Sequence, residues 1–304
     1  MDFTVSVIMP CQNAGRWVAA ALRSAAEQTL ACHEIVVIDD GSKDDSLDQI
    51  AASGIPVKLV ETKDANAAGA RNIGIEAATG NWIAFLDADD TWYPHHLKHA
   101  SELLSDQPDV AYLAHCDLLV HESEEVATTA PYSVGGATAG LTDLDFLTLW
   151  AERTHFPNGG VVARRDRAIE VGLFDTTQVR RHDFELFMRI VKEHSWAYDP
   201  RPGWRYRAGT PGAISRNIAE CSYYSLRAVL NNEPAYRGPE MDRLVSKYAR
   251  SAMTEAFLHG SDSDRERAWG LAKQHLGFRR KMFYGAFGRF PKLFPLLHKA
   301  ARGA

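Results

Sequence analysis

The sequence predicts an α/β fold with a single Rossmann-like, mostly parallel sheet flanked by helices and followed by a C-terminal helical extension. Two observations lead to this fold class. Short apolar runs rich in β-branched residues alternate with stretches of helical spacing over the first ninety residues. From about residue 216 onward the pattern is helical throughout. A strand–helix–strand order implies parallel pairing through right-handed crossovers. We expect a sheet domain at 1–215 and a helical extension at 216–304.

The first part of the chain has the clearest element boundaries. The expected strands cover residues 5–10, 34–40, 57–62 and 81–87, and the expected helices between them cover 15–29, 41–53 and 67–79. Pro10 ends the first strand, because proline has no N–H to donate to a sheet. Ser42 is expected to cap the second helix, since Asp45 follows three residues later at a spacing close to a capping box.

The pattern is looser after residue 95. We expect helices at 95–104, 141–153 and 182–193, strands at 109–120 and 159–165, and a mobile loop at 122–140. The helix at 182–193 is amphipathic, because its apolar residues recur at helical spacing.

Composition favours an ordinary globular protein. Of the 304 residues, 45% are hydrophobic and 24% are charged, and no apolar run reaches the ~18 residues of a transmembrane helix. The N-terminal stretch MDFTVSVIMP lacks the basic start and apolar centre of a secretion signal, so we expect a cytoplasmic protein. The four cysteines are far apart and form no CxxC pair, which predicts reduced thiols.

Charge is distributed unevenly along the chain. Nine of the 34 Lys and Arg residues lie in 267–304, which contains no Asp or Glu. Residues 1–266 therefore carry 25 basic against 39 acidic side chains, a net charge of −14. An acidic body argues against nucleic-acid binding, and the basic end indicates an anionic partner near the C-terminus.

Acidic residues follow two of the predicted strands at the point where each strand ends. Asp39 and Asp40 close one strand, and Asp87, Asp89 and Asp90 follow another. The carboxyl ends of parallel strands meet at one edge of a sheet, where open α/β sheets bind ligands. Asp87-Ala88-Asp89 is a D-x-D pattern whose oxygens suit Mg²⁺ or Mn²⁺. The alternative for this segment is an acidic turn without a ligand.

Two segments resemble glycosyltransferase family 2, the inverting nucleotide-sugar transferases with the GT-A fold. The first is SVIMPCQNAGRWVAAALRSAAEQTLACHEIVVIDDGSKDDS at 6–46, and the second is ARNIGIEAATGNWIAFLDADDTWYPHHL at 70–97. They occur in the order and at the spacing of that family. The resemblance is strong over 3–100 and extends more weakly to about 215.

The resemblance implies roles for five residues. Asp40 would contact the uracil of a UDP-sugar, with Pro10 beside the base and Arg71 reaching the base or the pyrophosphate. Asp89 would be the main ligand of Mn²⁺ or Mg²⁺, and Asp87 would assist and face the ribose or the metal. The alternatives are a helix-capping role for Asp40 and a surface position for Arg71.

The resemblance also assigns a general base. In the segment RRHDFELFMRI, Asp183 matches the family's base, and His182 stands where Glu or another residue is usual. The alternative is that Asp183 only caps the helix that follows it, and Glu185 and His182 are the other candidates for the base. Asp175 matches an element that is usually structural.

One position departs from the family pattern. Gly209 stands where the family often has a histidine that faces the pyrophosphate or the metal. Arg207 and Arg216 are the candidates to compensate for it, and Ser215 keeps the family's serine.

The predicted activity is metal-assisted transfer of a sugar to a hydroxyl of a glycan or lipid-linked acceptor, as in polysaccharide biosynthesis. The alternatives are a nucleotidyltransferase on a related sheet and an inactive nucleotide- or glycan-binding protein. The basic, aromatic tail at 277–304 either lies on the inner face of an anionic membrane or packs on the catalytic domain or on a second subunit of a homodimer.

Three weaker signals do not indicate a site. His95, His96 and His99 lack the glutamate of an HExxH motif, which favours a solvated helix face. The Gly69–Gly74 spacing lacks the lysine of a P-loop, and no G-x-G-x-x-G follows the first strand.

Overall fold

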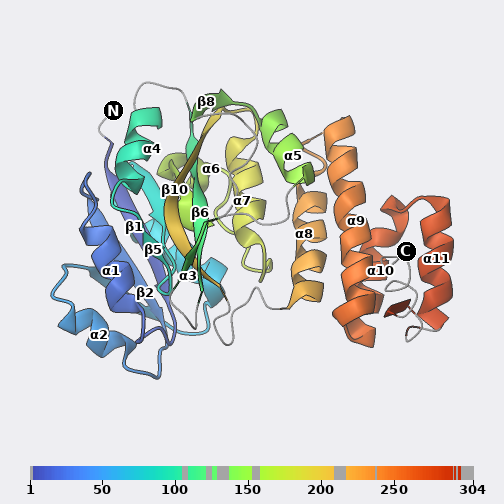
Figure 1. Ribbon diagram of the computed structural model, residues 1–304, viewed down its shortest axis with the longest axis horizontal. Coiled ribbons are helices and arrows are strands. Elements are labelled where there is room, and N and C mark those ends of the chain that lie inside the picture. Colours follow the sequence, from blue (N-terminus) through green and yellow to red (C-terminus); the bar gives the residue numbers. More distant parts are fainter. Residues whose placement is uncertain are drawn as a thin grey trace. The chain divides into compact units, whose positions relative to one another are not determined.

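The computed structural model describes residues 3–104, 109–120, 125–128, 137–152, 158–208, 217–236, 238–289, 291 and 294–295. The chain divides into two compact units (Figure 1). The first contains Met1–Phe146 and Thr154–Pro211, and the second contains Leu147–Arg153 and Gly212–Ala304. Residues 215 and 216, on either side of the predicted boundary, lie outside the described residues, so that boundary stays a prediction.

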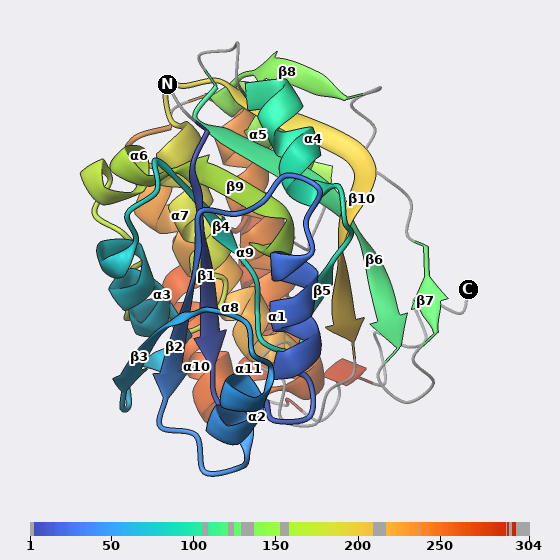
Figure 2. The same ribbon diagram turned by 90° about the vertical axis from the view of Figure 1, so that its left-hand side faces the viewer.

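The first unit is built on one ten-stranded sheet with the order β3-β2-β1-β4-β9-β6-β10-β5, in which β7 pairs with β6 and β8 with β10. The strands are β1 (Val5–Cys11), β2 (Glu34–Asp40), β3 (Lys58–Thr62), β4 (Trp82–Phe85), β5 (Thr91–Trp92), β6 (Ala111–Val120), β7 (Val126–Ala127), β8 (Thr138–Leu141), β9 (Val161–Arg164) and β10 (Trp196–Ala208). β1 lies between β2 and β4 and is parallel to both, and β2 is parallel to β3 (Figure 2). The parallel pairing predicted for the N-terminal part is therefore confirmed.

The other side of the sheet is mixed. β9 lies between β4 and β6 and is antiparallel to both, whereas β10 is parallel to β6. The sequence pattern did not predict β10, and the register of its pairing with β6 shifts between Asp199 and Trp204. Pro200 and Pro202 lie in this irregular stretch, where missing proline donors are tolerated. The loop expected at 122–140 was wrong in part, because it contains β7 and the start of β8.

The helices of this unit are α1 (Val18–Ala26), α2 (Ser46–Ala52), α3 (Asn66–Ala77), α4 (His96–Leu104), α6 (Arg165–Glu170) and α7 (His182–Val191), with a short 3-10 turn η1 (Asn158–Gly160). The helix α5 (Asp143–Glu152) begins in this unit, and its residues from Leu147 onward belong to the second unit. α1 and α4 cover one face of the sheet, and α6 and α7 cover the opposite face (Figures 1 and 2). Alternate residues of a strand point to opposite faces of the sheet. Val7 and Met9 belong to the core under α1, whereas Ile8 lies beneath Gly74 of α3.

The start of α2 differs from the prediction. The helix begins at Ser46, and Ser42 does not cap it. The Ser42 hydroxyl instead accepts a hydrogen bond from the backbone N–H of Asn13 at 2.9 Å, and Asp44 accepts one from the N–H of Gly15 at 3.0 Å. These bonds join the loop after β2 to the loop after β1, at the edge of the sheet where the acidic residues gather.

The C-terminal unit is helical, as the sequence predicts. Its elements are α8 (Ile218–Asn232), α9 (Pro239–His259), α10 (Asp262–Ala272), η3 (Lys273–His275) and α11 (Phe278–Arg289). Ser261 and Asp264 form a capping box at the start of α10. Within the ranges that the structure describes, no helix is both long enough and apolar enough to span a bilayer.

Candidate active site at the carboxyl ends of the strands

The adjacent strands β2, β1 and β4 bring their polar ends to one edge of the sheet. Cys11 at the end of β1 lies beside Asp39 of β2, and Ile8 pairs with Phe85, the last residue of β4. The D-x-D segment leaves β4 directly after this pair. The convergence predicted from the strand order is therefore present in the structure.

Asp39 and Asp40 make different contacts at the end of β2. Asp39 Oδ2 accepts a hydrogen bond from the N–H of Ser42 at 3.0 Å, and its buried Oδ1 has no partner in the described structure. Asp40 Oδ1 accepts from the N–H of Ala65 at 2.9 Å, and the backbone carbonyl of Asp40 accepts from Gln12 Nε2 at 2.9 Å. Asp40 is therefore held rigidly while its second carboxylate oxygen has no partner among the described residues.

The D-x-D carboxylates are packed closely and are only partly neutralised. Arg71 of α3, which is 4% exposed, forms an ion pair with Asp87. Burial and the charge of Asp87 raise the pKa of Asp89 to about 6. Burial and both neighbouring carboxylates raise the pKa of Asp90 well above its ordinary range. Burial and the closeness of the carboxylates therefore both disfavour the charged forms of Asp89 and Asp90.

Arg207 of β10 supports the acidic segment from the other side. Its backbone N–H donates to Asp90 Oδ1 at 2.8 Å, and its Nε donates to the backbone carbonyl of Asp89 at 2.9 Å. The side chain is buried, with 5% of its surface exposed. Asp90 and Arg207 therefore fix the backbone of the turn that presents Asp89.

His182 anchors the guanidinium that faces Asp87. Its Nε2 lies 2.6 Å from Nη1 of Arg71, while Nη2 of Arg71 pairs with Asp87. Burial and the charge of Arg71 lower the pKa of His182 well below its ordinary value. A neutral ring that accepts from an arginine at Nε2 carries its proton on Nδ1. His182, one of the alternative base candidates, is therefore occupied as a hydrogen-bond acceptor.

Asp183 lies in the first turn of α7, two residues after a residue with a left-handed backbone conformation. Arg181 precedes the helix with φ +58°, in the left-handed region that non-glycine residues rarely adopt. Asp183 Oδ1 accepts from the N–H of Phe184 at 2.8 Å. Burial raises the pKa of Asp183, and it interacts electrostatically with both Arg71 and Asp87. The predicted base is thus brought to the same cluster as the D-x-D segment.

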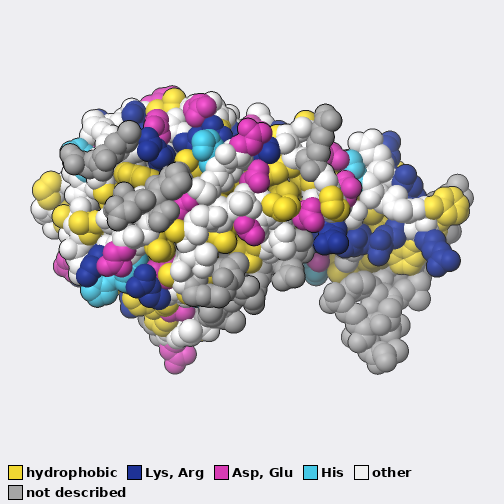
Figure 3. Space-filling model, turned by 90° about the horizontal axis from the view of Figure 1, so that it is seen from above, with side chains coloured by type: hydrophobic (Ala, Val, Ile, Leu, Met, Phe, Trp, Pro, Cys, Tyr) yellow, Lys and Arg dark blue, Asp and Glu magenta, His cyan; other side chains and the backbone are white. Residues whose placement is uncertain are grey.

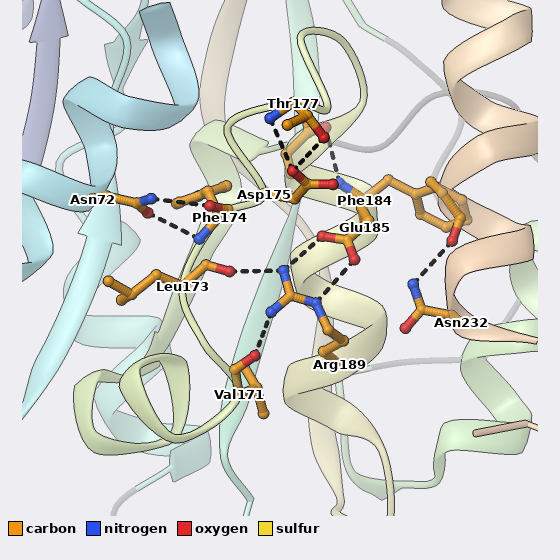
Figure 4. A network of polar contacts seen from close by, with 12 residues as sticks. Asn72, Val171, Leu173, Phe174, Asp175, Thr177, Phe184, Glu185, Arg189 and Asn232 are labelled. Carbon is orange, nitrogen blue, oxygen red and sulfur yellow. Dashed lines mark hydrogen bonds and ion pairs between the residues drawn. The ribbon is translucent and has the colours of Figure 1, made fainter. Parts of the chain in front are cut away.

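The position of α7 is fixed by a network of buried polar contacts (Figure 4). Glu185 accepts from Arg189 Nε at 2.9 Å and from its Nη2 at 2.6 Å, and Arg189 also donates to the carbonyls of Val171 and Leu173. Glu185, the other alternative base candidate, is therefore committed to this ion pair.

The same network joins the segment before α7 to α3. Asn72 exchanges two hydrogen bonds with the backbone of Phe174, at 2.9 Å and 2.8 Å. Asp175 accepts from the N–H and the hydroxyl of Thr177 at 2.8 Å and 2.6 Å, which is a turn-forming role. Asn72 follows Arg71 directly, so the network holds the helix of the arginine against the segment that leads to Asp183.

The solvated face expected for His95, His96 and His99 was wrong for His96, whereas His95 is exposed and His99 is half-buried. His96 is completely buried between the rings of Trp92 and Tyr112, at centroid distances of 4.8 Å and 5.7 Å. His99 Nδ1 lies 3.7 Å from the buried Asp199. Gly209, Ser215 and Arg216 lie outside the described residues.

In the part of the chain that is described, no group of three or more His, Cys, Asp and Glu side chains could hold a metal ion. Two carboxylates of the D-x-D segment nevertheless fit a hard cation that takes its remaining ligands from water and substrate phosphates. Burial and the neighbouring charge of Asp87 raise the pKa of Asp89, and a cation bound there would offset both effects.

Comparisons with known proteins place the fold. Residues 6–124 match the family model of Glycosyl transferase family 2. The structure of S. aureus TarS 1–349 in complex with UDP-GlcNAc aligns with a TM-score of 0.67 at 17% identity, covering 98% of this chain and 87% of that TarS fragment. The mannosyltransferase PcManGT from Pyrobaculum calidifontis, in complex with GDP-Man and Mn²⁺, aligns with a TM-score of 0.59 at 16% identity, covering 95% and 84%. The fold is that of the GT-A glycosyltransferases.

Curated relatives agree with this class. The amylovoran biosynthesis glycosyltransferase AmsB of Erwinia amylovora is 29% identical over 201 residues, 63% of this chain and 65% of AmsB. WfgD of Escherichia coli, a UDP-Glc:alpha-D-GlcNAc-diphosphoundecaprenol beta-1,3-glucosyltransferase, is 40% identical over 99 residues, 32% of this chain and 39% of WfgD. The chain thus matches less than two thirds of the length of these two relatives. Together with the family match over 6–124, these findings show that the N-terminal part of the chain is similar to the glycosyltransferases of family 2.

Proposed function

We propose that this protein is an inverting glycosyltransferase that uses a nucleotide-sugar donor, expected to be a UDP-sugar. The acceptor is a hydroxyl of a glycan or of a lipid-linked glycan. The observation that carries the proposal is the convergence of Asp89, Arg71 and Asp183 at the carboxyl ends of the strands. Asp89 lies on the turn that follows β4, Arg71 lies on α3 and Asp183 lies on α7. Contacts through Asp87 and His182 connect them.

The nucleotide would lie over the ends of β1 and β2. The second carboxylate oxygen of Asp40 has no partner among the described residues and would accept a hydrogen bond from the imide N–H of uracil, with Pro10 of the neighbouring strand beside the base. A carboxylate, which only accepts hydrogen bonds when it is ionised, suits this N–H donor. Support for a uridine donor comes from two of the proteins compared, since WfgD is named for UDP-Glc and TarS was solved with UDP-GlcNAc.

The diphosphate would face Arg71 and the D-x-D segment. Asp89 would be the main ligand of a divalent cation, with Asp87 assisting, because Arg71 already takes one oxygen of Asp87. When bound, the cation supplies positive charge that stabilises the departing nucleoside diphosphate. Mn²⁺ and Mg²⁺ both suit such an oxygen site, and PcManGT was solved with Mn²⁺.

Asp183 would act as the general base. The acceptor oxygen attacks the anomeric carbon from the face opposite the nucleotide, a new C–O bond forms, and the bond to the diphosphate breaks. The proton of the acceptor hydroxyl goes to the carboxylate of Asp183. Burial raises the pKa of this group above the ordinary value for Asp, which makes it a stronger proton acceptor.

The test separates binding from chemistry. Asp89→Asn should abolish metal-dependent binding of UDP, measured by calorimetry, whereas Asp183→Asn should bind UDP like the wild type and lose transfer by at least ~10²-fold. Asp48→Asn, on the exposed face of α2, is the matched control and should change neither property.

The pH dependence of sugar transfer is a second test of the role of Asp183. Transfer at saturating donor should fall as the pH drops through the pKa of Asp183, since the base must be deprotonated to accept the proton. Normal transfer by Asp183→Asn would show that this residue is not the base. A wild-type protein that binds UDP-sugars but neither transfers nor hydrolyses the sugar would be the inactive binding protein instead.

A further inference from the structure

The first helix turns of α11 expose apolar and basic side chains together. Phe278 is 79% exposed, Met282 is 62% exposed and Phe283 is 48% exposed, which places all three among the most exposed large apolar residues of the described structure. The three residues between the first two, Arg279, Arg280 and Lys281, are also exposed. Scattered exposed apolar side chains are ordinary, but three within six residues form a patch.

These apolar side chains cannot be hidden by rotating the helix, because α11 is already anchored by another residue. Tyr284 is 7% exposed, stacks on Phe257 of α9 at a centroid distance of 5.9 Å, and its hydroxyl lies 2.9 Å from Thr254 Oγ1. Phe294 packs on the same ring at 4.9 Å. The packed side of α11 is therefore occupied, and the patch on its other sides faces solvent.

Further basic side chains lie on α9. Arg243, Lys247 and Arg250 line an open hollow of about 560 Å³, together with Ser246, Thr148 and the acidic residues Glu240 and Asp242. Figure 3 shows dark-blue Lys and Arg side chains gathered over these C-terminal helices, with hydrophobic side chains beside them.

The basic side chains of the two helices are close to one another. Burial and the charge of Arg280 lower the pKa of Arg250, so α9 and α11 bring like charges together. In the part of the chain that is described, the side chains of Arg243, Arg250 and Arg280 form no hydrogen bond or ion pair. Like charges without a carboxylate partner repel each other, and an anionic ligand would relieve that repulsion.

We propose that the surface formed by Arg243, Lys247 and Arg250 of α9 and residues 278–283 of α11, the basic–aromatic surface, binds an anionic lipid bilayer. Charge complementarity is the first argument, because residues 267–304 hold nine Lys and Arg and no acid, whereas the rest of the chain has a net charge of −14. Exposed Phe and Met side chains are the second, because they partition into the boundary between headgroups and acyl chains. A nucleic acid would use only the basic half of this surface.

The basic–aromatic surface lies in the C-terminal unit, so the inference does not depend on the proposed sugar transfer. It goes beyond that proposal in naming the surface by which the enzyme would be held near a lipid-linked acceptor. Each basic residue near an anionic membrane strengthens binding roughly fivefold, which predicts roughly a hundredfold loss for three.

The experiment is sedimentation of the full chain with vesicles of phosphatidylcholine alone and with vesicles that also contain phosphatidylglycerol. We expect binding only to the anionic vesicles, with a loss as salt is raised. The triple variant Arg279→Gln, Arg280→Gln, Lys281→Gln should weaken this binding roughly a hundredfold. The matched control replaces Lys43, Lys63 and Lys98, exposed residues of the sheet unit, with Gln and should bind like the wild type.

A second variant tests insertion rather than adsorption. Phe278→Trp should show a blue shift of its fluorescence when anionic vesicles are added, and the triple Gln variant carrying the same tryptophan should not. Equal binding to neutral and anionic vesicles, or no binding, would overturn the proposal. So would a concentration-dependent dimer that Phe278→Ser disrupts while vesicles remain unbound, because the surface would then serve a second copy of the chain. UDP binding and transfer to a soluble acceptor, measured on the same variants, keep this outcome separate from the proposed enzymatic function.

Discussion

Gly74 on α3 offers a test of how the helix that carries Arg71 packs on the sheet. A Cβ atom at Gly74 would lie 2.6 Å from Cγ2 of Ile8 and 2.7 Å from Cδ1 of Ile38. Both isoleucines are fully buried in adjacent strands. Because carbon atoms pack at ~3.5–4.0 Å, the helix or the strands must move by roughly 1 Å to admit the methyl group.

Gly69 on the same helix is the matched control. Its Cβ would meet Ala65 at 3.4 Å and Thr176 at 3.9 Å, which is ordinary contact. Gly69→Ala should therefore stabilise the protein by up to ~1 kcal/mol, because alanine favours the helix over glycine. Gly74→Ala gains the same helix-propensity stabilisation but loses ~1–3 kcal/mol of stability to overpacking. The gain in helix propensity is the same in the two variants and cancels when they are compared. Gly74→Ala should therefore be ~1–3 kcal/mol less stable than Gly69→Ala.

Urea unfolding followed by tryptophan fluorescence measures this difference, provided that the slope m is unchanged. If the helix moves, Arg71 moves with it, so Gly74→Ala should also weaken UDP binding, which Gly69→Ala should leave intact. Equal stability of the two variants would mean that α3 does not pack against Ile8 and Ile38 as described, and the placement of Arg71 would have to be reconsidered.

Two further predictions concern buried histidines. Replacing His182 with Ala removes the acceptor for Arg71 and should lower affinity for UDP by roughly 10- to 100-fold, since a hydrogen bond to a charged group contributes ~1.5–3 kcal/mol. His182→Gln should restore part of the lost affinity. Wild-type affinity in the Ala variant would refute the anchoring role. Burial lowers the pKa of His96 to about 3, below its unfolded value of 6.5, so the unfolded state binds the extra proton and stability is lost as the pH falls below 6.5. Between pH 6.5 and pH 4 the wild type should therefore lose up to roughly 3 kcal/mol more than His96→Phe, measured by urea unfolding at each pH; equal losses would show that His96 is accessible to solvent.

Local patterns were sufficient for much of the first unit. The predicted strand at 34–40 coincides with β2, and the predicted helix at 67–79 differs from α3 by one residue at its start and two at its end. Such elements can be predicted from the sequence because a buried strand needs a continuous apolar run and a helix needs apolar residues at helical spacing. The placement of acidic residues after β2 and β4 followed from the same reading, since parallel strands end at one edge.

The sequence alone therefore determined the order of the elements, the parallel N-terminal half of the sheet and the edge where the acidic residues meet. The tertiary structure decided which groups face each other there. His182 contacts Arg71 across 111 positions of sequence, β10 joins the sheet despite its prolines, and His96 is enclosed by rings from β5 and β6. The physical reason is that periodicity depends on neighbours within a few residues, whereas these contacts depend on how distant elements pack, which no local pattern encodes.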